Sequence, residues 1–275
     1  EQDGWSTVDN GDKVYNLNGL YPDNKAVQLF PHWKKVPYTI TYVLNGGVND
    51  AENPATYTLD DSTGIALKDP TRVGYKFEGW YEAEDFSGSK IAKFQAKTPY
   101  GNKTLYAKWS QIVVTVKAEE KSCDYNGKNC GAKVSITGVP GGYKGYAITD
   151  SIKNVKDGPI AAKIVGFIIV NTTTGDTVTS AFNVVFNESG SVSVNPKLVN
   201  FTTDNIPPAT YTGDSIHVKG SSKTKDLIAG HTHNVGYTVD ALEWREDGYD
   251  PVMTDPAKVK ILDADGNDVT YNYTI

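Results

Sequence analysis

The fold of this chain is decided by Gly74-Tyr-Lys-Phe-Glu-Gly-Trp-Tyr81 together with Lys103-Thr-Leu-Tyr-Ala-Lys-Trp109, which follows it. Both stretches alternate apolar and polar residues, which is the period of a half-buried β-strand. The apolar residues fall at odd positions, namely Tyr75, Phe77 and Tyr81 in the first stretch and Leu105, Ala107 and Trp109 in the second. We therefore expect two strands that each turn one face toward a small core.

Self-comparison shows that this region is duplicated. Gly79-Trp80 begins a run that ends at Lys90, and Gly4-Trp5 begins a similar run that ends at Lys13. The Gly-Trp pairs lie 75 residues apart (79 − 4), and the closing tryptophans, Trp109 and Trp33, lie 76 apart (109 − 33). A unit that recurs at a fixed period predicts a repeat architecture. Residues 37–110 are thus expected to form a complete repeat, and residues 1–36 the C-terminal part of an earlier copy.

The front of the complete repeat adds a third strand. Tyr38-Thr-Ile-Thr-Tyr-Val-Leu44 alternates as a strand, and Asn45-Gly-Gly47 is a turn signal. Ala55–Leu67 fits either a strand or a short helix.

A different duplicated unit follows Ser110. Tyr125-Asn-Gly127 returns as Tyr211-Thr-Gly213, 86 residues later (211 − 125). Thr174–Phe182 returns as Asp265–Tyr273, 91 residues later (265 − 174). Residues 111–197 are therefore expected to form one β-rich repeat and residues 198–275 a second copy, without a counterpart of the closing strand Gly190–Pro196. Lys121–Lys128 is expected to be a turn.

Composition favours β-structure along the whole chain. Seventeen Tyr and one Met among 275 residues suit strands, and 26 Gly and 13 Pro suit many turns. The predicted fold class is mainly β: a tandem, elongated array of small β-grasp-like modules with separate cores, with room for a short helix.

Charge and hydropathy argue against two classes of partner. The net charge is −6, and no run of Lys and Arg forms the basic stripe of a nucleic-acid-binding protein. The longest apolar stretch, Ile164–Val170, is too short to span a bilayer. Glu1–Trp5 lacks the features of a signal peptide, so the chain is interpreted as an internal part of a longer protein. Separately, it is expected to be a monomer.

The two cysteines, Cys123 and Cys130, flank Asp124–Lys128. A turn of this length can bring the two side chains together, so a disulfide is predicted; two unpaired thiols are the alternative.

Metal-binding patterns are weak. His231-Thr-His233 would place two imidazoles on one side of a strand, with Asp240 or Glu243 as a third zinc ligand, or leave both rings in solvent. Asp263, Asp265 and Asn267 fit the start of a calcium loop, but Gly266 and Thr274 do not fit its later positions. No metal or cofactor is therefore predicted.

No catalytic motif is recognisable either. Glu82, Glu84 and Asp85 are expected to be a solvated turn, because glycosidase chemistry needs two carboxyl groups facing each other across a cleft. Four tryptophans recur at fixed positions of the repeats and are assigned to packing within or between modules. Trp244, with Tyr249, is the candidate for a ligand patch.

Two family resemblances cover nearly the whole chain. Tyr38–Tyr42 with Asn45-Gly-Gly47, Pro70–Tyr81 and Leu105–Trp109 together resemble the Listeria–Bacteroides repeat, the internalin-type B repeat of bacterial surface proteins. Residues 111–275 resemble the MBG-type repeats of bacterial adhesins, on the Tyr-x-Gly turns, on Gly190–Pro196 and on Asn272–Ile275. The first resemblance implies β-grasp-like modules in tandem on exported proteins, and no catalytic residues.

These resemblances imply an extracellular, non-enzymatic role at the bacterial cell surface or cell wall. The chain is expected to be part of an adhesin, serving as a stalk or spacer whose partners are neighbouring repeats and host glycan or extracellular protein. The alternative is a set of carbohydrate-binding accessory modules of a larger secreted enzyme.

Overall fold

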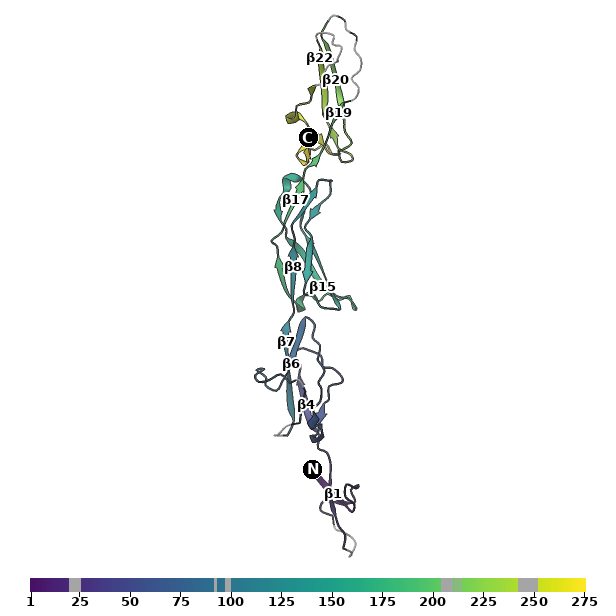
Figure 1. Ribbon diagram of the computed structural model, residues 1–275, viewed down its shortest axis with the longest axis vertical. Helices are drawn as coiled ribbons and strands as arrows, with labels where there is room; N and C mark the ends of the chain where they lie inside the picture. Colours follow the sequence, from purple (N-terminus) through teal and green to yellow (C-terminus); the bar gives the residue numbers. More distant parts are fainter. Residues whose placement is uncertain are drawn as a thin grey trace. The chain divides into compact units, whose positions relative to one another are not determined.

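The computed structural model describes residues 1–19, 26–91, 93–96, 100–203, 210, 212, 214–241 and 252–275. The chain folds into two units (Figure 1). The first comprises Glu1–Val113 and Ser180–Asn183, and the second comprises Val114–Thr179 and Val184–Ile275.

Strands dominate both units, which confirms the mainly β fold class. Within the described ranges, the helical segments are short 3-10 turns: η1 (Leu59–Thr63), η2 (Val155–Asp157), η3 (Thr179–Ala181), η4 (Pro256–Lys258) and η5 (Thr270–Asn272).

A four-stranded sheet organises the complete repeat of the first unit. Its order is β5 (Thr56–Tyr57), β4 (Tyr38–Val43), β7 (Lys103–Gln111) and β6 (Tyr75–Tyr81). β4 runs parallel to β7, whereas β6 runs antiparallel to it. The segment Ala55–Leu67, for which both alternatives were open, contains one short strand, β5, and one 3-10 turn, η1.

The core of this repeat lies on one face of the sheet. Its buried side chains come from strands that the alternation of the sequence predicts, and from the connecting segments: Ile40, Tyr57, Trp80, Phe94, Leu105 and Ala107. Leu105 and Ala107 are fully buried, as expected from their odd positions in β7.

A smaller sheet forms from the N-terminal residues. Its order is β2 (Tyr15–Asn16), β1 (Gln2–Ser6) and β3 (Phe30–Trp33), all antiparallel. β3 pairs with β1 on one side, and among the described residues no strand pairs with its other side. Pro31 lies in this edge strand, opposite Trp5.

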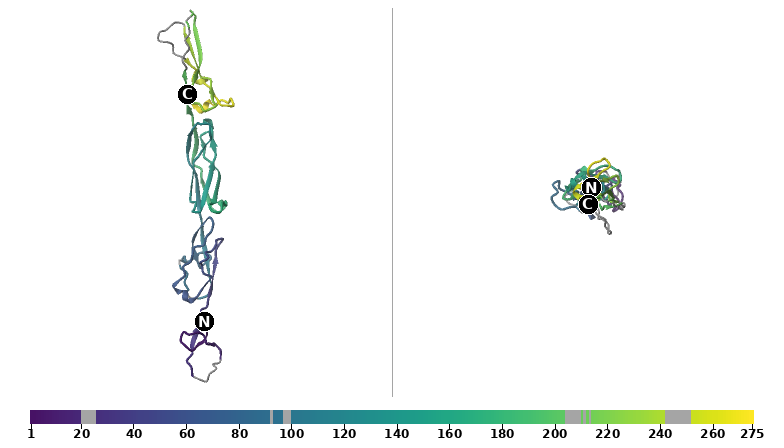
Figure 2. Two further views of the ribbon diagram at one scale, coloured as in Figure 1. Left: turned by 90° about the vertical axis from the view of Figure 1, so that its right-hand side faces the viewer. Right: turned by 90° about the horizontal axis from the view of Figure 1, so that it is seen from above.

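The second unit begins with strands that run side by side in both ribbon views (Figures 1 and 2). They form four small sheets: β11 (Val134–Thr137) with β8 (Val113–Ala118) and β16 (Asn183–Asn187); β12 (Tyr143–Thr149) with β15 (Ile164–Asn171); β14 (Ile160–Ala161) with β17 (Ser191–Asn195) and β9 (Lys121–Asp124); and β10 (Cys130–Gly131) with β13 (Ser151–Ile152). The prediction that Lys121–Lys128 is all turn is wrong in its first half. Lys121–Asp124 is a strand because it pairs in parallel with β17.

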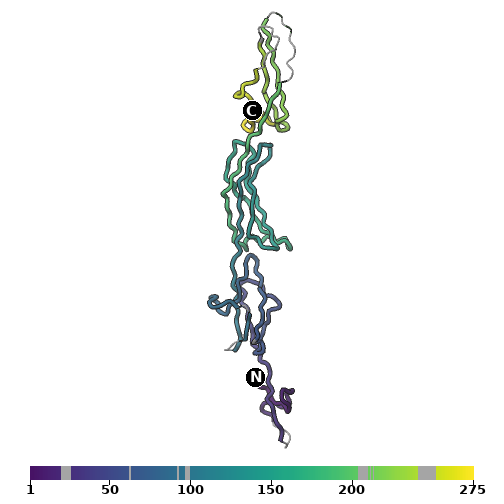
Figure 3. Tube along the Cα trace, in the orientation of Figure 1, coloured from purple at the N-terminus to yellow at the C-terminus, as the bar shows by residue number. Residues whose placement is uncertain are grey.

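The remaining strands belong to residues 197–275, whose path can be followed in Figure 3. β19 (Thr202–Thr203), β20 (Ile216–Lys223), β22 (Gly236–Ala241) and β23 (Val252–Met253) form one sheet; β21 (Thr232–His233) pairs with β24 (Ile261–Leu262), and β18 (Lys197–Leu198) pairs with β25 (Tyr273–Thr274).

One cluster of buried side chains in the second unit contains residues from both regions that the repeat pattern predicts to be separate modules. The cluster runs from Ala118 through Val192 and Val199 to Ile261 and Tyr273. Burial therefore continues across the expected boundary between residues 197 and 198. The four-part division of the chain itself stays a prediction.

Candidate functional site

The duplicated Gly-Trp pairs occupy the same position in equivalent strand pairs. In the complete repeat, the register of β6 on β7 shifts by one residue between Phe77 and Gly79, so that Gly79 pairs with Lys108. In the N-terminal sheet, the register of β1 on β3 shifts between Gln2 and Gly4, so that Gly4 pairs with His32. The two Gly-Trp pairs thus share a β-bulge at the equivalent register position, although Gly79 has a φ of +144° and Gly4 is not among the glycines with a positive φ.

The environment of the glycine is also shared. A Cβ atom added to Gly79 would lie 2.5 Å from Lys90 Cε, and one added to Gly4 would lie 2.5 Å from Lys13 Cδ. The residue after each lysine donates its backbone N–H to the tryptophan carbonyl, at 2.9 Å in both copies. Each glycine therefore lies against the aliphatic part of a lysine side chain, and at Gly4 the Tyr15 carbonyl oxygen also occupies the space of an added Cβ.

This bulge corrects one prediction of the simple alternation. Phe77 and Trp80, rather than Phe77 and Tyr81, turn toward the same core, and their ring centroids lie 5.3 Å apart. The extra residue at the bulge moves every later side chain to the other face. Tyr81 instead packs on Phe86, with a centroid distance of 5.8 Å.

The tryptophans differ in exposure, so the packing role predicted for all four holds only in part. Trp80 is 2% exposed, whereas Trp33 is 65% exposed. Trp109, the counterpart of Trp33, donates its indole N–H to the Leu44 carbonyl at 2.9 Å. Among the described residues of 1–33, no strand takes the place that β4 has beside β7. Trp33 lines a shallow groove of about 320 Å³ with Tyr38 and Leu59.

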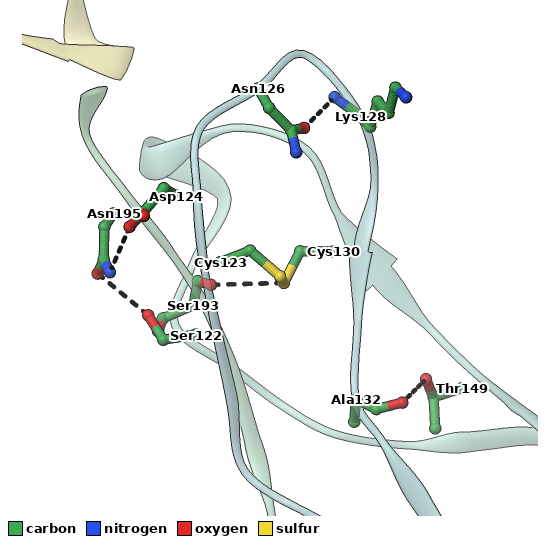
Figure 4. The surroundings of a disulfide bond; sticks show 10 residues. All are labelled: Ser122, Cys123, Asp124, Asn126, Lys128, Cys130, Ala132, Thr149, Ser193 and Asn195. Atoms are coloured by element: carbon green, nitrogen blue, oxygen red, sulfur yellow. Dashed lines mark hydrogen bonds between the residues drawn. A yellow bond between two sulfur atoms is a disulfide. The ribbon is translucent and has the colours of Figure 1, made fainter. Parts of the chain in front are cut away.

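The predicted disulfide partners lie at the start of the second unit. Cys123 on β9 and Cys130 on β10 form a disulfide across the turn that joins these strands, with their Cα atoms 6.1 Å apart (Figure 4). Within the turn, Asn126 Oδ1 accepts the Lys128 N–H at 2.9 Å. Cys130 is 3% exposed. A buried, locally closed disulfide of this kind is suited to holding a turn.

Polar side chains beside the disulfide connect β9 to β17. Ser193 Oγ donates to Ser122 Oγ at 3.1 Å, and Asn195 Nδ2 donates to Asp124 Oδ1 at 3.2 Å (Figure 4). These bonds align the parallel pair on its exposed face.

The two candidate zinc histidines have separate partners. His231 Nδ1 pairs with the Tyr273 hydroxyl at 2.8 Å, and His233 Nδ1 accepts the Val235 N–H at 3.2 Å. Asp240, one proposed third ligand, pairs with His217 instead. Glu243, the other, lies outside the described residues, as do Trp244 and Tyr249 of the predicted ligand patch and Tyr211 of the second Tyr-x-Gly turn.

The candidate calcium residues form a closed turn. Asp263 Oδ1 accepts the N–H groups of Asp265 and Asn267, at 3.0 Å and 2.9 Å. These hydrogen bonds lower the pKa of Asp263. The carboxylate oxygen that would face a cation is thus used by the turn itself. In the part of the chain that the structure describes, no group of three or more His, Cys, Asp or Glu residues could hold a metal ion.

The acidic residues Glu82, Glu84 and Asp85 are exposed on a turn after β6. Asp85 Oδ1 accepts the Ser87 N–H at 2.9 Å, and hydrogen bonds from Ser87 lower the pKa of Asp85. Glu82 lines an open hollow of about 430 Å³ beside Lys90 and Phe94. These hydrogen bonds stabilise a turn, and the three carboxyl groups do not face one another across a cleft.

One set of residues was not found from the sequence as a group. Tyr125, His231, Asn272 and Tyr273 meet in the second unit, although up to 148 positions separate them (273 − 125). The sequence patterns that include these residues are the Tyr-x-Gly motif, for Tyr125, and the end of the second copy, for Asn272 and Tyr273.

No helix in the described ranges is long and apolar enough to cross a membrane.

Comparison with known proteins supports one of the two resemblances. Residues 38–108 match the model of the Listeria-Bacteroides repeat domain. Two similar proteins come from Evansella cellulosilytica: one named "Putative membrane protein", 31% identical over 133 residues, and one named "Putative Gly-rich membrane protein", 30% identical over 166 residues. The matches cover 47% and 56% of this chain but only 17% and 16% of those proteins. No solved structure matches the chain. Residues 38–108 are thus a Listeria-Bacteroides repeat domain within a mainly β chain.

Proposed function

We propose that this chain is a non-catalytic part of the extracellular region of a bacterial cell-surface protein, in which small β modules act as the stalk of an adhesin. The observation that carries the proposal is the duplicated Gly-Trp bulge, because copying one scaffold along a chain adds length without adding a reactive site. The match of residues 38–108 to a repeat domain of this class, and the names of the relatives as membrane proteins, support an envelope location.

The proposal also assigns a module type to each region. Residues 37–110 would be a β-grasp-like module, and residues 111–197 and 198–275 two MBG-type modules. Equivalent hydrogen bonds in the two later regions favour this assignment. Ile169 and Ile261 each donate their N–H to a threonine hydroxyl at 2.8 Å, those of Thr179 and Thr270.

Surface proteolysis tests the location. Intact cells of the source bacterium would be treated with a protease and probed with antibodies against residues 38–108. The proposal predicts loss of the signal before any cytoplasmic marker is cleaved. Retention of the signal until the cells are lysed would overturn it.

Spacing is tested separately. In a surface-displayed version with a tag at the outer end, deletion of residues 37–110 should reduce tag accessibility to a bulky antibody while leaving binding of a small tag ligand unchanged. Equal loss for both probes would argue against a spacer.

The exposed indole of Trp33 is the one observation that favours the carbohydrate-binding alternative, since sugars stack on exposed aromatic rings. A glycan array with the unchanged chain and Trp33→Ala distinguishes the two functions. A stalk predicts no glycan signal that depends on Trp33. A signal that disappears in Trp33→Ala would favour the carbohydrate-binding module.

A further inference from the structure

Asn272, at the end of η5, is a fully buried polar side chain whose partners lie far away in the sequence. Its Nδ2 donates to Asn154 Oδ1 at 3.0 Å, and its Oδ1 accepts the Val155 N–H at 2.8 Å. Asn154 and Val155 begin η2, in the part of the second unit that precedes Pro196. An amide in residues 197–275 thus satisfies polar groups in residues 114–195.

The turn that carries Asn272 does not itself require the amide. η5 and η3 are built alike, because Val269 donates to the Ile261 carbonyl and Val178 donates to the Ile169 carbonyl, both at 2.8 Å. The residue at the position of Asn272 in η3 is Ala181, which has no amide. The side chain of Asn272 is therefore explained by its contacts with η2.

Aromatic rings surround this contact. Tyr125 and Tyr273 are 4% and 7% exposed, and their rings meet edge to face with centroids 5.4 Å apart. The Tyr273 hydroxyl accepts the Ile228 N–H at 3.4 Å and pairs with His231 Nδ1. Edge-to-face pairs of this kind add to the energy of burial.

The connection between the two parts is also ordered. β17 ends at Asn195 and β18 begins at Lys197, so one residue, Pro196, separates the strands. β18 pairs in parallel with β25, and Val199 donates its N–H to the Thr274 carbonyl at 2.9 Å. No flexible linker intervenes at this point.

We propose that Asn272 and the Tyr125–His231–Tyr273 ring cluster form a fixed joint, so that residues 114–195 and 197–274 of the second unit open and unfold as one body. Asn272 is the positioning residue of this joint. Such a joint would give the proposed stalk a stiff element, and this role rests on the proposed function. Its existence is measured on the isolated chain, so its failure is distinguishable from failure of the surface location.

Native-state hydrogen exchange of the whole chain, followed by NMR at increasing urea, tests the joint. The Ile169 and Ile261 amides are matched reporters, because both residues are fully buried and both donate to a threonine hydroxyl at 2.8 Å. In the unchanged chain, both amides should approach the same free energy of opening, obtained from the exchange rate relative to the unprotected rate of each amide, and the same urea dependence.

Two variants then distinguish the loss of a contact between the two parts from the loss of a contact within one part. Asn234→Ala is the control, because Asn234 donates to the Lys258 carbonyl and accepts the Lys260 N–H, so that its bonds stay within residues 197–275. It should accelerate both reporter amides together. Asn272→Ala should accelerate both amides, because each part loses the stabilisation that the other gives it, but by factors that differ by about 10- to 100-fold, since buried polar partners are left unsatisfied and the two parts now open separately.

Two results would overturn the proposal. If Asn234→Ala accelerates only the Ile261 amide, the two parts are already independent. If Asn272→Ala accelerates both amides equally, Asn272 does not couple them. Should Asn272→Ala fail to fold, the unchanged chain and Asn234→Ala still decide whether the two parts unfold together.

Discussion

Replacement of Gly79 by alanine tests the bulge on which the duplication rests. Gly79 has a φ of +144°, a region that residues with a Cβ atom avoid. Holding alanine in such a conformation costs about 1–3 kcal/mol. The added Cβ would also lie 2.5 Å from Lys90 Cε, but a lysine side chain can move away at small cost. We therefore expect the free energy of unfolding of the repeat to fall by about 2 kcal/mol.

Urea denaturation followed by tryptophan emission measures this loss. Trp80, which is 2% exposed, reports on the core of the repeat. A module of this size has an m-value of about 1 kcal/mol per molar urea, so the midpoint should fall by about 2 M.

Two control variants separate the causes. Gly88→Ala has a positive φ of +84° and no atom within 4 Å of the added Cβ, so it measures the backbone cost alone. Adding Lys90→Ala to Gly79→Ala measures the crowding. A midpoint for Gly79→Ala close to that of the unchanged chain would show that this position tolerates a side chain, and the argument from the bulge would fail.

Three further predictions concern the second unit. Reducing the Cys123–Cys130 disulfide, which closes a loop with a sequence separation of 7, should lower the unfolding free energy of this unit by about 2 kcal/mol; calorimetry with and without a reductant checks it, and an unchanged second-unit transition would contradict it. Burial lowers the pKa of His231 below its unfolded value; the positive charge of Lys153 also lowers this pKa, whereas the negative charge of Asp263 raises it. The stabilisation is therefore complete above about pH 6.5 and is lost as the pH falls through the folded pKa, so the thermal midpoint should decline below about pH 6.5 and decline less in His231→Gln. Calcium should leave the midpoint unchanged, because the turn N–H groups already occupy the Asp263 carboxylate; a rise that disappears in Asp263→Ala would refute this.

The strands of the complete repeat could be predicted from local pattern. β4, β6 and β7 lie within one or two residues of the alternating stretches, because alternation reports directly on which side chains face the core. The disulfide could be predicted for a similar reason, since two cysteines across a short turn are close whatever the rest of the chain does.

Features that depend on an extra residue or on distant contacts could not be predicted in this way. The bulge at Gly79 turns Trp80 rather than Tyr81 into the core, and alternation alone contains no signal for such a shift. The contact of Asn272 with Asn154 joins residues 118 positions apart, which no local pattern reveals. The strand at Lys121–Asp124 forms because it pairs with β17. Its own sequence is mostly polar and therefore resembles a turn when it is considered without that partner.

In the part of the chain that the structure describes, no strand pairs with the outer side of β3, and this has a consequence for self-association of the chain. An unpaired strand edge is a template on which other chains can add strands and begin to aggregate. Pro31 stands in this strand where the complete repeat has Ala107, and a proline has no N–H to offer an incoming strand. Lys34 and Lys35 follow directly and add charge that a growing fibril would have to bury. We expect Pro31→Ala to promote aggregation of this chain, which light scattering at high protein concentration would detect.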